Sequence, residues 1–124
     1  MRSPPLILAV DDNPSGLEII AARLTASGYR VITATDGEAG LAAARAQQPD
    51  LILLDLLMPD MNGAETFKKI RKINEKIPVI IITGVSDDFK QFISSRRSVP
   101  PPKGYLSKPV EPEELIGLVE KLLN

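Results

Sequence analysis

The sequence predicts a doubly wound α/β domain in which five strand-helix units surround a parallel sheet. Two observations lead to this fold class: short and almost wholly apolar runs are typical of strands buried on both faces, and segments with helical periodicity separate those runs. Glycine or proline punctuates many of the junctions, as it does at helix boundaries. A length of 124 residues fits one domain that buries most of its apolar surface.

The apolar runs are the expected strands. In chain order they are Leu6–Val10, Val31–Ala34, Leu51–Leu54, Val79–Ile82 and the briefer Tyr105–Leu106. In an open doubly wound sheet, functional groups collect at the carboxyl ends of the strands, so residues distant in sequence meet there. The residues that directly follow these runs are therefore the first place to look for a functional site.

The first two helices carry clear boundary signals. Asn13 can cap a helix that begins at Pro14, and Gly28 closes it. Its apolar stripe has the 3.6-residue period and consists of Leu17, Ile20, Ala21 and Leu24. The second helix is rich in alanine and lies between Asp36-Gly37 and Pro49.

The third helix begins beyond Gly63 and the last one begins at Pro112. The third has Phe67, Ile70 and Ile73 as its apolar positions, and the last has Leu115, Ile116, Val119, Leu122 and Leu123. Basic residues Lys68, Lys69, Arg71 and Lys72 share the third helix, and we interpret them as a solvated face.

The fourth unit is irregular. Only Phe89, Phe92 and Ile93 have the spacing of a helical apolar face there. The proline run 100–102 that follows cannot be helical. Because polyproline is stiff and donates no backbone hydrogen bonds, we expect it to shorten this helix or hold the next loop extended.

Composition excludes several classes of function. Fifteen basic and 16 acidic residues give a net charge of −1, which predicts no direct binding to nucleic acid or to an anionic membrane. Cysteine and histidine are both absent, which removes disulfides, thiolate or imidazole metal sites, Ser-His-Asp catalysis and a phosphohistidine donor. With no apolar stretch of membrane-spanning length and no signal-peptide core, we expect a cytoplasmic location.

Polar residues follow four of the five strands and together predict one site. Asp11 with Asp12, Asp55, Thr83 and Lys108 supply three carboxylates, one hydroxyl and one ammonium group. Carboxylates held together repel each other unless a cation joins them, and clustered oxygen ligands suit Mg²⁺. The expected occupants are a divalent metal and a phosphoryl group. Taken singly, each residue has an ordinary interpretation as a helix cap, turn residue, strand end or solvated charge.

Four segments resemble, in the same order, those of the receiver domain of two-component response regulators. They are Val10-Asp11-Asp12-Asn13, Asp55-Leu56-Leu57-Met58-Pro59-Asp60-Met61-Asn62-Gly63, Ile82-Thr83-Gly84 and Tyr105-Leu106-Ser107-Lys108-Pro109. The resemblance covers essentially the whole chain. It implies a flavodoxin-like sheet with strand order 2-1-3-4-5 and one receiver domain over residues 1–124.

The resemblance also implies a chemistry. Asp55 would accept a phosphoryl group from a partner's phosphohistidine, a role that carboxylates take in covalent phosphoryl transfer. Mg²⁺ or Mn²⁺ would be bound directly by Asp12, Asp55 and the carbonyl of Leu57, and through water by Asp11. The metal offsets charge on the transferring oxygens. Such a protein catalyses only its own phosphorylation and dephosphorylation, so it is not a conventional enzyme.

Further residues take roles from the same resemblance. Lys108 and Thr83 would contact phosphoryl oxygens, and Tyr105 would be the switch aromatic whose ring responds to Thr83. A lone aromatic beside a strand is otherwise more often simple packing. Four residues would shape the backbone around the site, namely Pro59, Gly63, Gly84 and Pro109, the last after a cis peptide bond.

The implied partners are a sensor histidine kinase or a histidine phosphotransfer protein, and a downstream protein on the face of the fourth helix, last strand and last helix. A homodimer through that face is also implied. The segment 99–104 departs from the family's usual small residues, which leaves open a phosphorylation-independent protein-binding module. A haloacid-dehalogenase-type phosphatase would need an acid where Leu57 stands, and a flavin carrier would need more aromatic residues and a phosphate loop.

Overall fold

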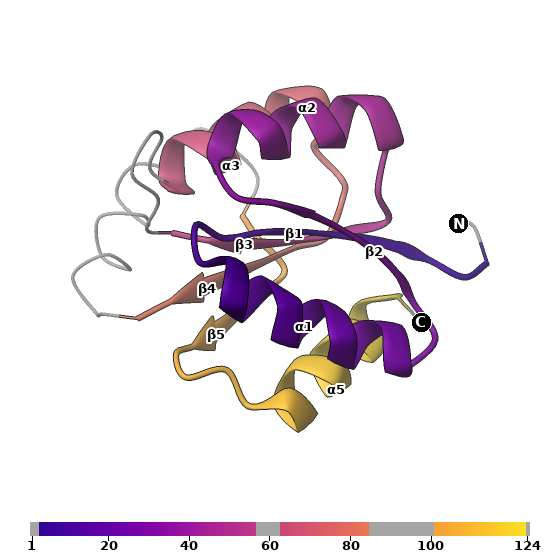
Figure 1. The fold of residues 1–124 in the computed structure, drawn as a ribbon. Helices are drawn as coiled ribbons and strands as arrows, with labels where there is room; N and C mark the ends of the chain where they lie inside the picture. Colours follow the sequence, from indigo (N-terminus) through magenta and orange to yellow (C-terminus); the bar gives the residue numbers. More distant parts are fainter. Residues whose placement is uncertain (1–2, 57–62, 85–100, 124) are drawn as a thin grey trace.

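The computed structural model describes residues 3–56, 63–84 and 101–123, and these form the expected doubly wound α/β fold (Figure 1). The elements are β1 Leu6–Val10, α1 Pro14–Ala26, β2 Arg30–Ala34, α2 Gly37–Gln47, β3 Leu51–Asp55, α3 Gly63–Ile73, β4 Val79–Thr83, β5 Gly104–Ser107 and α5 Pro112–Leu123. The expected fourth helix lies outside the described residues. Among the described helices, none has the length and apolar character needed to cross a membrane.

The five strands form one parallel sheet in the order β2-β1-β3-β4-β5, which confirms the predicted order. Val10 pairs with Ala34 on one side and Leu54 on the other, so β1 and β3 end at the same level. The ladder continues through Asp55, opposite Ile82, and this is why β3 is one residue longer than its apolar run. Strand boundaries follow the backbone pairing and not the hydropathy of the side chains.

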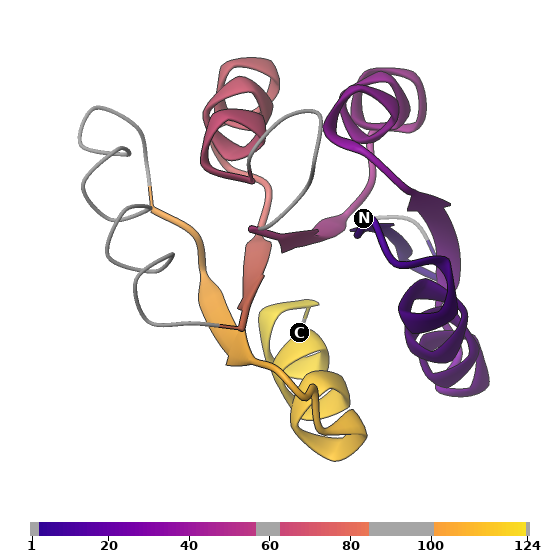
Figure 2. The same cartoon turned by 60° about the vertical axis from the view of Figure 1, so that its left-hand side comes forward.

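Two helical layers cover the sheet, with α2 and α3 on one face and α1 and α5 on the other (Figures 1 and 2). Alternate residues of each central strand point to opposite layers: Leu8 packs beneath α2 and α3, whereas Ile7 packs against α1 and α5. All five residues of β1 and all five of β3 are buried. Burial on both faces explains the unbroken apolar runs in the sequence.

The helix boundaries confirm the capping signals. The Asn13 side chain accepts hydrogen bonds from the backbone N–H groups of Ser15 and Gly16 at 3.1 and 3.3 Å. Asp36 accepts one from Ala39 at 2.7 Å and begins α2 in the same way. These caps satisfy backbone donors that have no partner within the helix. After α1, Gly28 adopts a φ of +99°, which an L side chain rarely adopts.

The prediction that the basic residues of α3 form a solvated face is wrong for Arg71. Lys69 and Lys72 are exposed as predicted, but Arg71 is 5% exposed. Its guanidinium donates hydrogen bonds to the carbonyl oxygens of Ile77 at 2.7 Å and Pro101 at 3.1 Å, and it lies 4.9 Å from the ring centroid of Phe67. Periodicity along one helix cannot reveal carbonyl partners that come from later loops.

The same substitution should have opposite effects on two helices. A Cβ at Gly40 would lie 2.9 Å from Cγ2 of the buried Val10, whereas a Cβ at Gly117 would meet no atom within 4 Å. Gly40→Ala should lower the free energy of unfolding by about 1–2 kcal/mol, because overpacking outweighs the gain in helix propensity. Gly117→Ala should raise it by about 0.5–1 kcal/mol. Urea titrations of both variants check this, and a stabilised Gly40→Ala would contradict the packing of α2 on β1.

Candidate functional site

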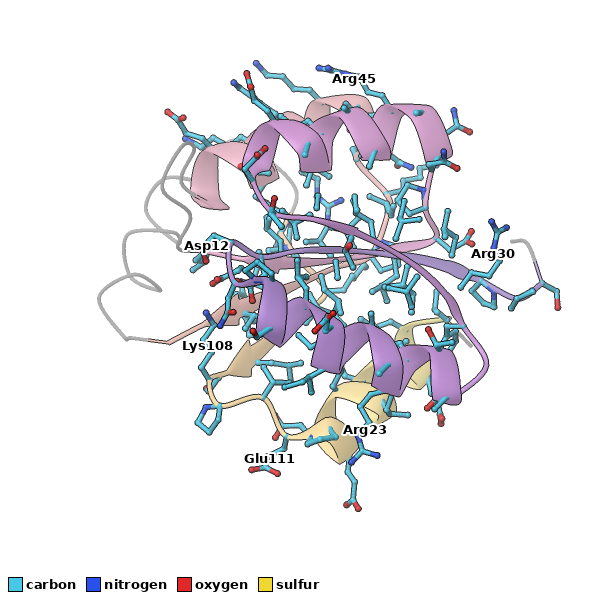
Figure 3. The ribbon with its side chains drawn as sticks, viewed as in Figure 1. Asp12, Arg23, Arg30, Arg45, Lys108 and Glu111 are labelled. Atoms are coloured by element: carbon cyan, nitrogen blue, oxygen red, sulfur yellow. The ribbon has the colours of Figure 1, made fainter. Side chains whose placement is uncertain are left out.

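Three carboxylates meet at the carboxyl edge of the sheet. Asp11 and Asp12 follow β1, Asp55 ends β3, and one oxygen from each lies within 4.8 Å of the others. Asp11 is 6% exposed and Asp55 is 1% exposed, whereas Asp12 is exposed. Figure 3 shows Asp12 and Lys108 at this end of the sheet and Arg30 at the opposite end. The neighbouring parallel strands β1 and β3 thus bring together the predicted acidic residues.

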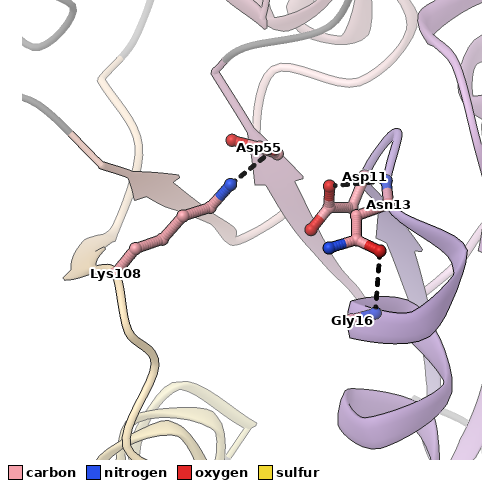
Figure 4. A network of polar contacts seen from close by, with 5 residues as sticks. All are labelled: Asp11, Asn13, Gly16, Asp55 and Lys108. Atoms are coloured by element: carbon pink, nitrogen blue, oxygen red, sulfur yellow. Dashed lines mark hydrogen bonds and ion pairs between the residues drawn. The ribbon is translucent and has the colours of Figure 1, made fainter.

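Lys108 closes the site from the other side. It follows β5, and its Nζ lies 2.9 Å from Oδ2 of Asp55, so the side chain spans the end of β4 (Figure 4). The Lys108 side chain is 38% exposed while Asp55 is almost fully buried. A partly solvated ammonium therefore balances a buried carboxylate. This ion pair is the direct contact between the described residues of β5 and the acidic cluster.

Burial is the main influence on Asp11. It raises the pKa of this carboxyl from 3.8 to about 6, and the backbone N–H of Asn13, 3.1 Å from Asp11 Oδ1, acts in the opposite direction. The hydrogen bond and charge of Asp55 raise the pKa further, while the charge of Lys108 lowers it. Without a cation, the Asp11 carboxyl is therefore half ionised near its pKa of about 6.

The charges in the site also shift the pKa of Lys108. Partial burial by itself would lower the pKa of its ammonium group, but the hydrogen bond and charge of Asp55 act in the opposite direction. The charges of Asp11 and Asp12 add to that effect, and the pKa of Lys108 is raised. The ammonium group therefore stays charged beside the cluster.

The donor set fits a hard divalent cation. Three carboxylates from two adjacent strands offer oxygen ligands only, which suit Mg²⁺ or Mn²⁺ and do not favour soft metals. The raised pKa of Asp11 also indicates a cation site, because either a proton or a metal ion relieves the excess negative charge here. Asp11, Asp12 and Asp55 thus form an acidic triad suited to a divalent metal ion.

Gly63 has a steric reason to lack a side chain. Its N–H donates to the carbonyl oxygen of Leu56 at 2.7 Å, and an added Cβ would lie 2.3 Å from the Leu56 Cα. It would also lie 2.7 Å from the Asp55 carbonyl oxygen. Helix α3 therefore starts directly against the end of β3. At Gly84, an added Cβ would make an ordinary 3.6 Å contact with Lys108, so its expected role stays a prediction.

The structure describes only some of the remaining predicted residues. The Lys108-Pro109 bond is cis, as the resemblance implied. Thr83 ends β4 opposite Ser107, although the position of its side chain lies outside what the structure describes, and Leu57 and Pro59 lie outside the described residues. The Tyr105 side chain is 37% exposed on β5.

Sequence reasoning assigned Asn13 to a helix cap and missed its second contact. Its backbone N–H holds the Asp11 carboxylate while its side chain caps α1 (Figure 4). The signal was present, because an aspartate two residues before a turn N–H commonly forms such a bond. Asn13 therefore orients Asp11 and starts the helix beside it.

The chain matches the family model of the response regulator receiver domain over residues 7–120. It is 34% identical to protein PilH of Pseudomonas aeruginosa over 119 residues, covering 94% of this chain and 96% of PilH. It is also 34% identical over 118 residues to the alkaline phosphatase synthesis transcriptional regulatory protein PhoP of Bacillus subtilis, covering 95% of this chain and 48% of PhoP. The chain thus spans about half the length of PhoP and of the Mycobacterium tuberculosis probable regulator TcrX.

Solved structures agree with this similarity. A CheY-like response regulator receiver domain protein from Methanospirillum hungatei superposes with a TM-score of 0.88 at 28% identity, covering 96% of this chain and 93% of that one. Chemotaxis protein CheY4 of Vibrio cholerae gives a TM-score of 0.84 at 31% identity, with 96% and 98% covered. Both likenesses extend over nearly the full length of each chain.

The raised pKa of Asp11 predicts a pH-dependent stability. Because the folded state holds this proton more tightly than the unfolded state, ionised Asp11 destabilises the metal-free protein above pH 6, and this penalty disappears as the pH falls toward 3.8. In the presence of a chelator, Asp11→Asn should therefore raise the free energy of unfolding at pH 7 by about 1–3 kcal/mol. Denaturant titrations from pH 4 to about pH 8 test the prediction.

The matched control is Asp12→Asn, which removes a neighbouring but exposed carboxylate and should change stability less. A stability gain for Asp11→Asn that is the same at both ends of the pH range would show that charge burial is not its cause.

Proposed function

The chain belongs to the response regulator receiver domain family, and from this premise we propose that Asp55 is its phosphoacceptor. It is a signalling module rather than a conventional enzyme. Its acidic pocket of Asp11, Asp12 and Asp55 is consistent with phosphoacceptor activity in two-component signalling. The observation that carries the proposal is the buried Asp55 carboxylate, which ends the central strand and is paired with Lys108 at 2.9 Å.

Burial and pairing distinguish Asp55 from its two acidic neighbours. An oxygen of Asp55 attacks phosphorus in a partner's phosphohistidine, the phosphorus–nitrogen bond breaks, and the imidazole leaves with the electron pair. Lys108 already contacts Oδ2 of this carboxylate, so it lies close to the oxygens that the phosphoryl group brings. A charged ammonium there offsets negative charge during transfer. Asp12 is exposed and Asp11 is turned toward the Asn13 N–H, which suits them to metal binding.

The proposed cation is Mg²⁺ or Mn²⁺. Asp12, Asp55 and the Leu57 carbonyl would bind it directly, and Asp11 would act through water. Bound there, the ion would supply positive charge to the transferring oxygens. The oxygen-only donor set and the close approach of the three carboxylates support this assignment.

The switching roles follow from the same proposal. Lys108 exchanges the Asp55 carboxylate for a phosphoryl oxygen, and Thr83 binds another phosphoryl oxygen from the end of β4. Tyr105 lies two residues along β5 from Ser107, the residue that pairs with Thr83, and this proximity supports its coupling to the site. Backbone shaping is assigned to Pro59, Gly63, Gly84 and Pro109. A ligand shifts such a switch only by its differential interaction with the two states.

Receiver domains partner histidine kinases. For this chain we propose a cytoplasmic location and, as the donor, a sensor histidine kinase or histidine phosphotransfer protein that acts on a domain of residues 1–124. The downstream protein would bind the face of the fourth helix, β5 and α5, where a homodimer could also form. The balanced charge of −1 supports output through protein and not through direct contact with DNA or membrane.

Removal of the Asp55 carboxylate should abolish labile phosphorylation. With acetyl phosphate and Mg²⁺, the native protein should gain the mass of one phosphoryl group, whereas Asp55→Asn and Asp55→Ala should gain none. Asp36→Asn is the matched control, because it removes a carboxylate after β2 while asparagine preserves the cap of α2. Intact-mass spectrometry checks all four proteins. The assignment is wrong if Asp55→Ala is modified like the native protein.

Metal affinity should depend more on Asp12 than on Asp11. Alanine at the water-mediated position should weaken Mg²⁺ binding by about 10-fold to 100-fold, as loss of an outer-shell partner does, and alanine at the direct ligand should weaken it further. Titration calorimetry measures both affinities. Full affinity in Asp12→Ala would exclude this site as the metal centre.

A further inference from the structure

Lys108 directly follows strand β5, which has only one neighbour in the described sheet. The strand has four residues and lies at the edge of the sheet, where its backbone pairs only with β4 among the described strands. Its Leu106 side chain is buried, whereas those of Tyr105 and Ser107 are exposed. Short edge strands with one neighbour depend on contacts at their ends. The position of Lys108 therefore depends on what holds β5.

The amino end of β5 is tied to helix α3 through Arg71. The guanidinium NH2 group donates to the Pro101 carbonyl oxygen at 3.1 Å, and NH1 donates to the Ile77 carbonyl oxygen at 2.7 Å. One buried side chain thus joins the loop before β4 to the segment before β5. Pro101 and Pro102 have no N–H to donate to β4, so backbone hydrogen bonding from this segment begins only after them. The first N–H after them, that of Lys103, donates to Val79 at 2.9 Å.

A second and independent contact holds the same end. At Gly104, an added Cβ would lie 2.8 Å from Cδ2 of Leu118, so α5 packs directly on the backbone of the first residue of β5. Leu118 packs against the core between the sheet and the layer of α1 and α5. The start of β5 is therefore restrained by α3 from one side and by α5 from the other. At the far end, the corresponding restraint is the ion pair between Lys108 and Asp55.

We propose that Arg71 is a positioning residue that fixes the start of β5, so that Lys108 reaches Asp55 and β5 responds to phosphorylation toward its Lys108 end while its first residue stays fixed. The proposal rests on the proposed function of Asp55 for its second half. Phosphorylation changes the partner of Lys108 but leaves the bonds of Arg71 and the packing of Gly104 in place. The strand is then fixed at one end and adjustable at the other.

This arrangement separates two properties of the site. The carboxylates that would hold a metal lie on β1 and β3, in the centre of the sheet, while Lys108 depends on the edge strand β5. Loosening β5 should therefore impair phosphoryl transfer without weakening metal binding, because the three carboxylates stay in place. Loss of a core residue with only a general structural role would instead weaken every strand and both properties together.

The test compares Arg71→Met with Lys72→Met in the full chain. The first removes the buried guanidinium at similar volume, and the second removes an exposed cation from the next residue of the same helix. Arg71→Lys is a milder variant that keeps a charge but loses the guanidinium fork whose two nitrogens reach the two carbonyls, and it replaces Arg71→Met if that variant does not fold. The measurements are amide hydrogen exchange, Mg²⁺ affinity and the rate of phosphorylation by acetyl phosphate.

In Arg71→Met, exchange protection at Lys103 should fall about 10-fold relative to that of β1 and β3, because a hydrogen-bonded anchor is lost. Phosphorylation should slow on the order of 10-fold through misplacement of Lys108. Mg²⁺ affinity should not fall, and Lys72→Met should match the native protein in all three measurements. In the native protein, beryllofluoride should shift the amide signals of Ser107 and Lys108 more than those of Lys103 and Gly104.

Three results would overturn the proposal: unchanged protection at Lys103, an equal loss of protection across β1, β3 and β5 with weaker Mg²⁺ binding, or equal beryllofluoride shifts at both ends of β5. If the native protein accepts no phosphoryl group, the proposed function fails. The exchange comparison would still decide whether Arg71 fixes the strand.

Discussion

The constraint on which the site depends is the forced proximity of the Asp11 and Asp55 carboxylates. Strands β1 and β3 are neighbours in register, and both are buried along their whole length, so the backbone that carries the two carboxylates is held in place. Their repulsion and desolvation appear in the raised pKa of Asp11. The apolar core stabilises the fold despite these charges, and the Lys108–Asp55 ion pair offsets one of them.

Because Lys108 comes from an edge strand, charge balance at the centre of the sheet depends on the position of its periphery. Helix α3 connects the two regions. Its first residue, Gly63, lies against the end of β3 beside Asp55, and its Arg71 bonds the segment that leads into β5. A single rigid element therefore touches the acidic site at one end and the support of the lysine at the other. Coupling between sites needs a physical connection of this kind, although contact by itself does not measure coupling.

The proline run gains a clearer role from this geometry. Proline residues donate no N–H to the sheet, and the buried guanidinium of Arg71 instead bonds the Pro101 carbonyl oxygen from helix α3. Pro101 belongs to the proline run that looked least compatible with a regular strand-helix unit, and its bond to Arg71 provides a fixed point for β5. The 37% exposure of Tyr105, two residues beyond the backbone bond of Lys103, shows that this fixed point does not bury the ring.

Sequence patterns were enough to predict the five strands, the cap at Asn13, and the meeting of Asp11, Asp12 and Asp55, because each depends on short-range patterns or on the shared edge of parallel strands. Only the tertiary structure decided that Arg71 is buried, that Lys108 pairs with Asp55, and that Gly63 leaves no room for a side chain. These features depend on atoms that are distant in sequence, such as the Pro101 carbonyl. Periodicity along one element reports which face is apolar, but it carries no information about which distant polar group that face will meet.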